Sequence, residues 1–308
     1  MISVSDFYKS IFNQKVYKIA LDAGCTCPNR DGSLGFGGCI FCSQSGSGDF
    51  AASRELDFEN QIEKAKSLVD KKFSRKAARG EEISKKYIVY FQNFTSTYAG
   101  KNGDESRLFD LFLKSVSAAD VAGIAIATRP DCLSEKMLDF LAELSRRVFV
   151  QVELGFQTAN EKTAAFCHRG FTNEVYKSAV SRLHGAAEKA GGKIHVVTHL
   201  IFGLPGDREA DMMKSVREVC QAGSDGIKIT VLYVVEGTEL AKLYRAGEVR
   251  VLEKDEYFGL LKKALDIIPP DMVVHRLTGD PPKSILIAPQ WTANKRSVLN
   301  NLNKFLIK

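Results

Sequence analysis

Three cysteines near the N-terminus have the residue type and the spacing of a cluster site. Eleven residues separate Cys27 from Cys39, and two separate Cys39 from Cys42. Thiolates are soft donors that bind iron strongly, and a Cys-x-x-Cys pair can present two sulfurs to one cluster. The intervening loop is rich in glycine, which lets a backbone fold tightly around an inorganic core. The pattern favours a [4Fe–4S] cluster whose three thiolates leave one iron open.

An open iron of this kind can chelate the amino and carboxylate groups of S-adenosylmethionine. The reduced cluster then donates one electron to the sulfonium, and the 5′-deoxyadenosyl radical that forms removes a hydrogen atom from a substrate. Zinc is an alternative, because a structural zinc ion usually takes four ligands and Cys25 could be the fourth thiolate. A redox-active Cys-x-x-Cys pair of the thioredoxin type would normally open a helix in a much smaller α/β unit.

The composition predicts a cytoplasmic globular protein. Hydrophobic residues make up 44% of the chain and charged residues 26%, as in ordinary globular domains. No apolar run approaches the ~20 residues of a membrane span, and the N-terminus lacks an apolar signal core. The seven cysteines are therefore expected to be reduced thiols. A net charge of +6 is compatible with an RNA partner but is too modest to establish one.

The elements that must position these cysteines follow an alternation of apolar runs and amphipathic stretches. Near-continuous apolar runs predict strands covered on both faces, and the helical patterns between them imply a parallel sheet. The strands are expected at 15–21, 87–92, 123–129, 148–156, 194–203 and 227–235. Helices are expected at 58–73, 108–116, 133–144 (with Ser134 as N-cap), 173–190, 209–220, 253–268 and 294–306, and short strand-like pieces at 273–277 and 285–287.

The pattern divides the chain into a core and a C-terminal appendage that is not a separate domain. Residues 1–235 form the core with the cysteine loop, and residues 236–308 form a C-terminal extension packed on it. The stretch 71–86 contains seven basic and two acidic residues. A solvated helix end with its loop is the plainer reading of this stretch, and a phosphate-contacting patch is the alternative.

Motifs along nearly the whole chain resemble a known family. They are CPNRDGSLGFGGCIFCSQSGSGDFA, YFQNFTSTYA, ATRPDC, VELGFQTAN, HRGFT, THLIFGLPGD, LYVVEGTELA and VVHRLTGDPP…IAPQW…NK. The sequence resembles the YhcC/YtqA-type radical SAM family, which is akin to the catalytic subunit of elongator. The resemblance implies an α/β fold, the partial (β/α)6 TIM-like barrel of that superfamily with a small C-terminal appendage. It also implies a [4Fe–4S] cluster on Cys27, Cys39 and Cys42, with S-adenosylmethionine as the second cofactor.

The same resemblance implies a cofactor pocket at the carboxyl ends of the strands. Glu153, expected to end the fourth strand, resembles the carboxylate that binds the ribose hydroxyls. Arg169 resembles the arginine that pairs with the cofactor carboxylate; for Glu153 and Arg169 a structural ion pair is the alternative. The remaining expected cofactor contacts are Gln92, Asn93, Thr128, Ile201 and Leu204.

Substrate contacts are expected from a second set of polar residues. Lys228 and Tyr233 lie on the sixth expected strand, and His275 and Arg276 lie in the HRLTGD motif. His195 and His199 share one face of the fifth strand. A hydrogen-bonded core histidine is the commoner outcome at such positions, and a histidine that points into the cavity is the alternative.

A tRNA wobble uridine is the leading substrate hypothesis, because elongator-type relatives act on that base. The resemblance implies conversion of carboxymethylaminomethyluridine to aminomethyluridine, with a reductase such as flavodoxin or ferredoxin as electron donor. The alternatives are the same radical chemistry on a small molecule or peptide, and a zinc-stabilised RNA-binding protein without catalysis.

Overall fold

One curved parallel sheet forms the core of the molecule. The structure is a computed structural model that describes residues 2–46, 51, 55–77 and 85–307. Eight strands are hydrogen-bonded in the order β1-β9-β7-β6-β5-β4-β3-β2. Their bounds are β1 Ile2–Ser3, β2 Tyr17–Leu21, β3 Tyr87–Phe91, β4 Val121–Thr128, β5 Phe149–Gln157, β6 Ile194–Phe202, β7 Gly226–Val231 and β9 Val273–Arg276.

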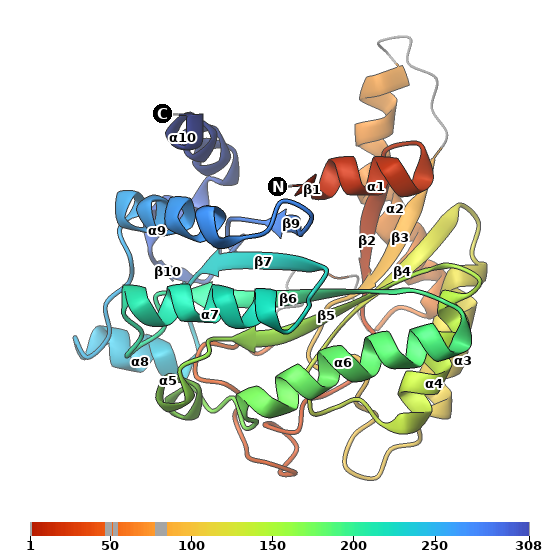
Figure 1. Ribbon diagram of the computed structural model, residues 1–308, viewed down its shortest axis with the longest axis horizontal. Helices are drawn as coiled ribbons and strands as arrows, with labels where there is room; N and C mark the ends of the chain where they lie inside the picture. Colours follow the sequence, from red (N-terminus) through yellow and green to blue (C-terminus); the bar gives the residue numbers. More distant parts are fainter. Residues whose placement is uncertain (1, 47–50, 52–54, 78–84, 308) are drawn as a thin grey trace.

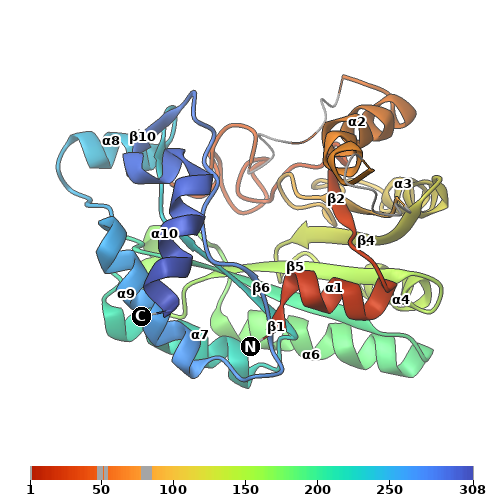
Figure 2. The same ribbon diagram turned by 90° about the horizontal axis from the view of Figure 1, so that it is seen from above.

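Helices surround this sheet, most of them on its outer side (Figures 1 and 2). They are α1 Val4–Phe12, α2 Phe58–Ala77, α3 Ser106–Ser117, α4 Glu135–Ser145, α5 Glu161–Phe166, α6 Asn173–Ala190, α7 Glu209–Gln221, α8 Glu239–Arg245, α9 Lys254–Ile267 and α10 Lys295–Ile307. Ser134 is the N-cap of α4, as the sequence predicts, and its hydroxyl accepts a hydrogen bond from the Met137 amide at 3.0 Å. None of the helices in the described part of the chain is long and apolar enough to cross a membrane.

The expected partial barrel is confirmed, but the sheet has two strands more than the six expected. Both additions lie at the β7 edge. Strand β9 pairs in parallel with β7, and β1 pairs with β9 through Ile2 and Val273. Strand β1 has only two residues, so no periodicity in the sequence could reveal it. The C-terminal segment is thus joined to the main sheet through β9, and β10 (Leu286–Ala288) pairs with β8 (Val234–Val235) in a separate antiparallel pair.

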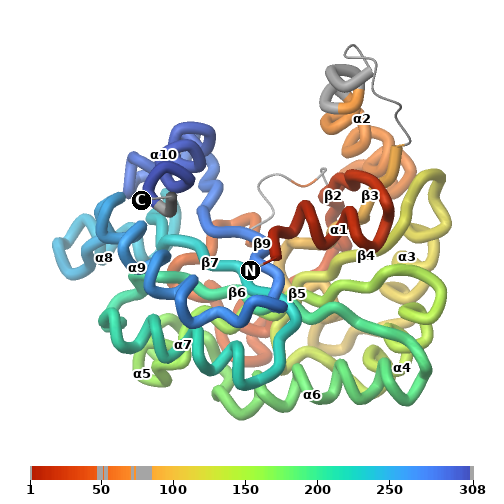
Figure 3. Tube along the Cα trace, turned by 45° about the horizontal axis from the view of Figure 1, so that its top comes forward, coloured from red at the N-terminus to blue at the C-terminus, as the bar shows by residue number. Residues whose placement is uncertain are grey.

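Helix α1 closes the end of the partial barrel at which the strands begin. It connects β1 and β2, the two edges of the sheet, and so crosses the opening between them (Figure 3). The Tyr8 hydroxyl donates to Gln151 Oε1 on β5 at 2.8 Å. The Phe7 ring stacks on His195 with centroids 4.3 Å apart. Because α1 fills this end, the barrel interior opens at the carboxyl ends of the strands.

Candidate active site

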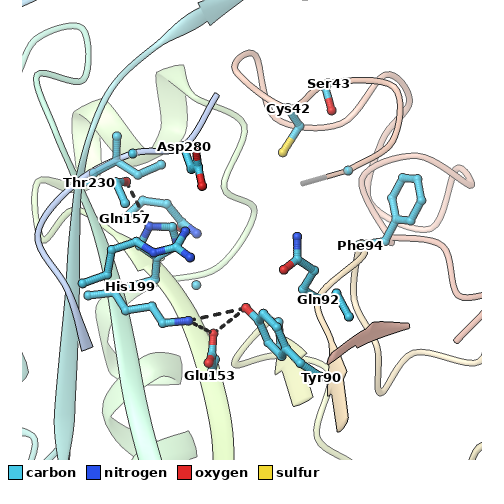
Figure 4. A pocket seen from close by; sticks show the side chains of 18 of the residues that line it. Cys42, Ser43, Tyr90, Gln92, Phe94, Glu153, Gln157, His199, Thr230 and Asp280 are labelled. Atoms are coloured by element: carbon cyan, nitrogen blue, oxygen red, sulfur yellow. Dashed lines mark hydrogen bonds and ion pairs between the residues drawn. The ribbon is translucent and has the colours of Figure 1, made fainter. Parts of the chain in front are cut away.

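A cavity of about 630 Å³ occupies the open end of the partial barrel. Side chains from the cysteine loop, from strands β2 to β7 and from the segment around β9 line it. Cys42 lies on one side of the cavity, and Glu153 and Tyr90 lie at the other end, with Gln92 between them (Figure 4). The site therefore combines a thiol-bearing wall with a polar floor inside the barrel.

The thiol-bearing wall contains Cys27, Cys39 and Cys42, which all line the cavity. The Cys42 amide donates to the Cys39 carbonyl at 3.0 Å, and Asn29 Nδ2 donates to Cys39 Sγ at 3.5 Å. A hydrogen bond from the Cys42 thiol lowers the pKa of Cys39 to about 7, against the effect of burial, and the Arg129 charge adds to this shift. A thiolate is therefore favoured at Cys39, whereas the same hydrogen bond and burial raise the pKa of Cys42.

Arg30 holds the cysteine loop in shape. Its guanidinium donates to the carbonyls of Cys42 at 3.3 Å and Ser43 at 2.6 Å. Gly38 has φ +85, and a Cβ there would lie 2.8 Å from Arg30 Nε. Glycine is required at this position, because only glycine adopts the conformation freely and leaves space for the arginine.

The donor set fits a [4Fe–4S] cluster. Three thiols face one cavity from a glycine-rich loop, and Arg30 and Arg129 line the same cavity. In the described ranges, no three His, Cys, Asp or Glu side chains come close enough for a single metal ion. Cys25 is 4% exposed and packs in the hydrophobic core, while the cavity lining includes Cys27. The arrangement therefore favours the three-thiolate cluster over zinc on four cysteines.

Glu153 does not end its strand, as the sequence reading expected, but is the central residue of β5. Both its oxygens have partners: Lys18 Nζ at 2.7 Å and Gln151 Nε2 at 2.6 Å on one, and Tyr90 Oη at 2.6 Å and Lys228 Nζ on the other. The expected strand, 148–156, ends within one residue of β5. The error lay in placing Glu153 at its end, because the residues that follow Glu153 in the ELGFQ motif still belong to the strand.

Two lysines share the Glu153 carboxylate at the floor. Burial alone would raise the pKa of Glu153, but Lys18 and Lys228 hold it well below its usual range. Burial likewise opposes the charge on Lys18, yet Glu153 raises the pKa of this lysine overall. For Lys228 burial prevails and lowers the pKa to about 7, because Lys18 and Arg276 oppose the attraction of Glu153. The floor therefore carries more cationic than anionic groups.

Arg169 is 2% exposed, and its guanidinium is fully engaged by the protein. Nε donates to Phe171 O, and Nη1 donates to Phe156 O and Thr158 O. Nη2 donates to Glu161 at 2.9 Å and to Asn173 at 3.0 Å. A guanidinium has five N–H donors, and these five acceptors use all of them. The geometry favours the structural ion pair over a cofactor contact for this arginine.

The cavity brings together most of the residues that the sequence singles out. Two of the expected cofactor contacts do not line it: Asn93 Nδ2 donates to Asp22 at 2.9 Å, and Leu204 packs in a separate apolar cluster. The residues that do line it, besides those described above, are Gln92, Thr128, Ile201, Tyr233, His275 and Arg276. His199 also lines it, whereas His195 lies below, with its Nε2 2.8 Å from His275 Nε2.

Lys18 and Tyr90 are site residues that sequence reasoning missed. Each faces the barrel interior from a strand that was expected, and alternate residues of a strand share a face. Tyr90 lies on β3, two positions before Gln92, which directly follows the strand, so the expected inward position of Gln92 could have identified Tyr90. Lys18 gave no comparable signal, because no chemical motif surrounds it. The basic stretch 71–86 lies partly outside the described residues, and among its described side chains Lys85 pairs with Asp70 at 2.8 Å.

Comparison with protein families assigns two segments of the chain. Residues 27–219 match the Radical SAM superfamily model, and residues 224–308 match the Radical_SAM C-terminal domain model. The chain is similar to YtqA of Bacillus subtilis, with 41% identity over 297 residues, covering 96% of this chain and 86% of that protein. It is also similar to YhcC of Escherichia coli, with 33% identity over 296 residues, covering 96% and 88%.

More distant similarities extend to proteins of archaea. A tRNA uridine(34) acetyltransferase of Methanocaldococcus jannaschii is 32% identical over 167 residues, which covers 53% of this chain and 29% of that protein. The structure of Elp3 from Methanocaldococcus infernus matches with a TM-score of 0.64 at 20% identity, covering 94% of this chain and 63% of that one. The latter similarity shows a shared fold. Together with the family models and the two bacterial relatives, these matches show that the chain is a radical SAM superfamily enzyme of the YtqA/YhcC family.

Proposed function

We propose that this enzyme acts on a wobble uridine of tRNA and converts a carboxymethylaminomethyl substituent to an aminomethyl group. The observation that carries the proposal is the shared cavity: Cys27, Cys39 and Cys42 form one wall, and Glu153 and Lys228 form the polar floor. When bound, the [4Fe–4S] cluster and S-adenosylmethionine supply a 5′-deoxyadenosyl radical that can remove a hydrogen atom from a substrate carbon.

In this scheme the residues of the protein bind S-adenosylmethionine and shield the radical from water. Gln92, Thr128 and Ile201 line the cavity and are proposed to contact S-adenosylmethionine. Helix α1 covers the opposite end of the barrel, with Tyr8 bonded to Gln151, and is proposed to limit the access of water from that end. Exclusion of water protects a reactive intermediate from side reactions.

Two observations support tRNA as the substrate. The chain is related in sequence to a protein named as a tRNA uridine(34) acetyltransferase, and its net charge is +6. Phosphate contacts would make tRNA binding weaken steeply with added salt. A low-potential flavodoxin or ferredoxin is the proposed electron donor, because radical SAM enzymes need a reductant.

The cluster is tested on anaerobically reconstituted protein. We expect about four iron per chain, as a cubane requires, and release of 5′-deoxyadenosine from S-adenosylmethionine with dithionite. The variants Cys27→Ala, Cys39→Ala and Cys42→Ala should lose both. Cys220→Ala is the matched control, since Cys220 lies on α7 outside the cavity lining. Zinc in place of iron, without deoxyadenosine, would contradict the proposal.

The substrate is tested with tRNA from cells that have or lack the gene. The proposal expects carboxymethylaminomethyluridine to accumulate, and aminomethyluridine to fall, when the gene is absent. The purified enzyme should restore aminomethyluridine in that tRNA. An unchanged nucleoside profile, together with active cleavage of S-adenosylmethionine, would direct the search to a small molecule or peptide substrate.

A further inference from the structure

Cations outnumber acids around the cavity. Among the residues that the structure describes, the acidic ones in its lining are Glu153 and Asp280, against seven lysines and arginines: Lys18, Arg30, Arg129, Arg169, Lys228, Arg276 and Lys295. Several of the cations have carboxylate partners of their own. Arg129 pairs with Asp131 at 2.7 Å, and Lys295 pairs with Asp280. Arg169 pairs with Glu161 at 2.9 Å. The remaining surplus lies in two places: at the cysteine loop, where Arg30 donates to two carbonyls, and at the floor, where Lys18 and Lys228 share Glu153.

Arg276 adds a further positive charge beside these lysines. It is the register partner of Lys228 across the β7–β9 pair. It is exposed in the cavity lining, and its guanidinium has no hydrogen-bond or ion-pair partner among the residues that the structure describes. Like charges at neighbouring positions of a sheet are destabilising. The arrangement is tolerated where an anionic ligand supplies the missing counter-charge.

We propose that Arg276 and Lys228 form a binding site for a carboxylate of the substrate. A guanidinium presents a planar fork that matches a carboxylate, and an ammonium adds a point charge. The inference rests on the proposed function for the identity of this carboxylate, which is the terminal group of the carboxymethylaminomethyl substituent. The site would hold that substituent inside the barrel and select it over aminomethyl, which ends in an amine.

S-adenosylmethionine also carries a carboxylate, so the location of the site matters. Glu153, the partner of Lys228, lies at the end of the cavity away from Cys42 (Figure 4). A carboxylate that chelates an iron held by the three thiolates would lie at the cysteine wall. The cation pair at the opposite end is therefore assigned to the substrate.

The test is calorimetric binding of two nucleosides, 5-carboxymethylaminomethyluridine and 5-aminomethyluridine, to the anaerobic holoenzyme. The wild-type enzyme should bind the carboxylate nucleoside at least about tenfold more tightly. Arg276→Met should reduce this preference to less than about threefold, and Arg276→Lys should retain part of it. Lys283→Met is the matched control: Lys283 is exposed in the same segment, lies outside the cavity lining and should have no effect.

Two results would overturn the inference. One is equal affinity for the two nucleosides, or no binding of either, in the wild-type enzyme. The other is a loss of S-adenosylmethionine affinity in Arg276→Met with nucleoside binding unchanged, which would assign the site to the cofactor carboxylate. The proposed function is tested separately. If the enzyme prefers the carboxylate nucleoside but does not convert tRNA, the proposed function is wrong, whereas the carboxylate-binding site is retained.

Discussion

Cys25 and Cys27 are separated by one residue, yet their side chains lie in different environments. Cys25 is 4% exposed within the hydrophobic core, whereas Cys27 lines the cavity with Cys39 and Cys42. Cys25→Ala should therefore keep a full complement of iron after reconstitution. It should lower the free energy of unfolding by about 1–2 kcal/mol, as expected for loss of a small buried group.

For Cys27→Ala we expect the opposite result when bound iron is measured after reconstitution. It should lose most of the bound iron with little change in the unfolding of the cluster-free protein, because Cys27 is only partly buried. Iron content and urea unfolding, measured on both variants, check the pair. Iron lost from Cys25→Ala but retained by Cys27→Ala would reverse the ligand assignment.

Arg169 should contribute to the stability of the fold and not to cofactor binding. Its removal leaves the carbonyls of Phe156, Thr158 and Phe171 without their charged donor. Each such bond is worth about 1.5–3 kcal/mol, so Arg169→Met should lower the free energy of unfolding by at least about 3 kcal/mol. Arg146→Met is the control, since Arg146 lies on the surface with a 53% exposed side chain, and it should change stability by less than about 1 kcal/mol. Unchanged stability in Arg169→Met with lost S-adenosylmethionine binding would restore the cofactor role.

Glu153 should be required to stabilise two lysines at the floor of the cavity, Lys228, which is buried, and Lys18, which is half-buried. Glu153→Gln removes the counter-charge of both lysines, and breaking a buried pair in this way costs about 3–5 kcal/mol. The deficit should shrink as the pH rises from 7 to 10, because Lys18, whose pKa Glu153 raises in the wild-type protein, then loses its proton in the folded variant. Urea unfolding at several pH values checks this, with Glu143→Gln on the surface as control. A deficit independent of pH would indicate a packing defect instead.

Sequence patterns located the strands of the barrel because each strand is covered on both faces. The continuous apolar runs correspond to β2 to β7, and each of these strands pairs with its neighbours in parallel. The helix expected at 173–190 coincides with α6, which ends at Gly191 with φ +71. A glycine in this conformation is a common helix stop. These features are local, and local residues specify them.

The charge network at the floor could not be predicted in the same way. Lys18, Glu153 and Lys228 lie on β2, β5 and β7, so 135 positions separate the first two and 75 the last two. Their pairing depends on the inward face of each strand and on the curvature of the sheet, and neither is encoded near any one of them. The same reason explains why Arg169 could be found by its motif while its five acceptors could not.

Three histidines in the barrel interior, of which His195 is buried and His199 and His275 are half-buried, should make the fold sensitive to mild acid. Burial lowers the pKa of His195 to about 4 and of His199 to about 3, and it holds the pKa of His275 well below its usual range. Below pH ~6.5 the unfolded chain takes up protons at these residues, while the folded protein does not. The free energy of unfolding should therefore fall as the pH drops from 6.5 to 5, by up to about 1.4 kcal/mol per pH unit for each histidine.

The contact between His195 and His275 strengthens this expectation. Their Nε2 atoms are 2.8 Å apart, so one imidazole must accept the hydrogen bond in its neutral form. Protonation of both rings would place two N–H groups against each other beneath the Phe7 ring, which stacks on His195. Urea unfolding between pH 5 and 7 measures how the free energy of unfolding changes with pH. His199→Gln should reduce this slope by the contribution of about one proton. His168→Gln, with a 52% exposed side chain, should leave the slope unchanged. A wild-type slope near zero in this range would mean that the barrel interior takes up protons without loss of structure.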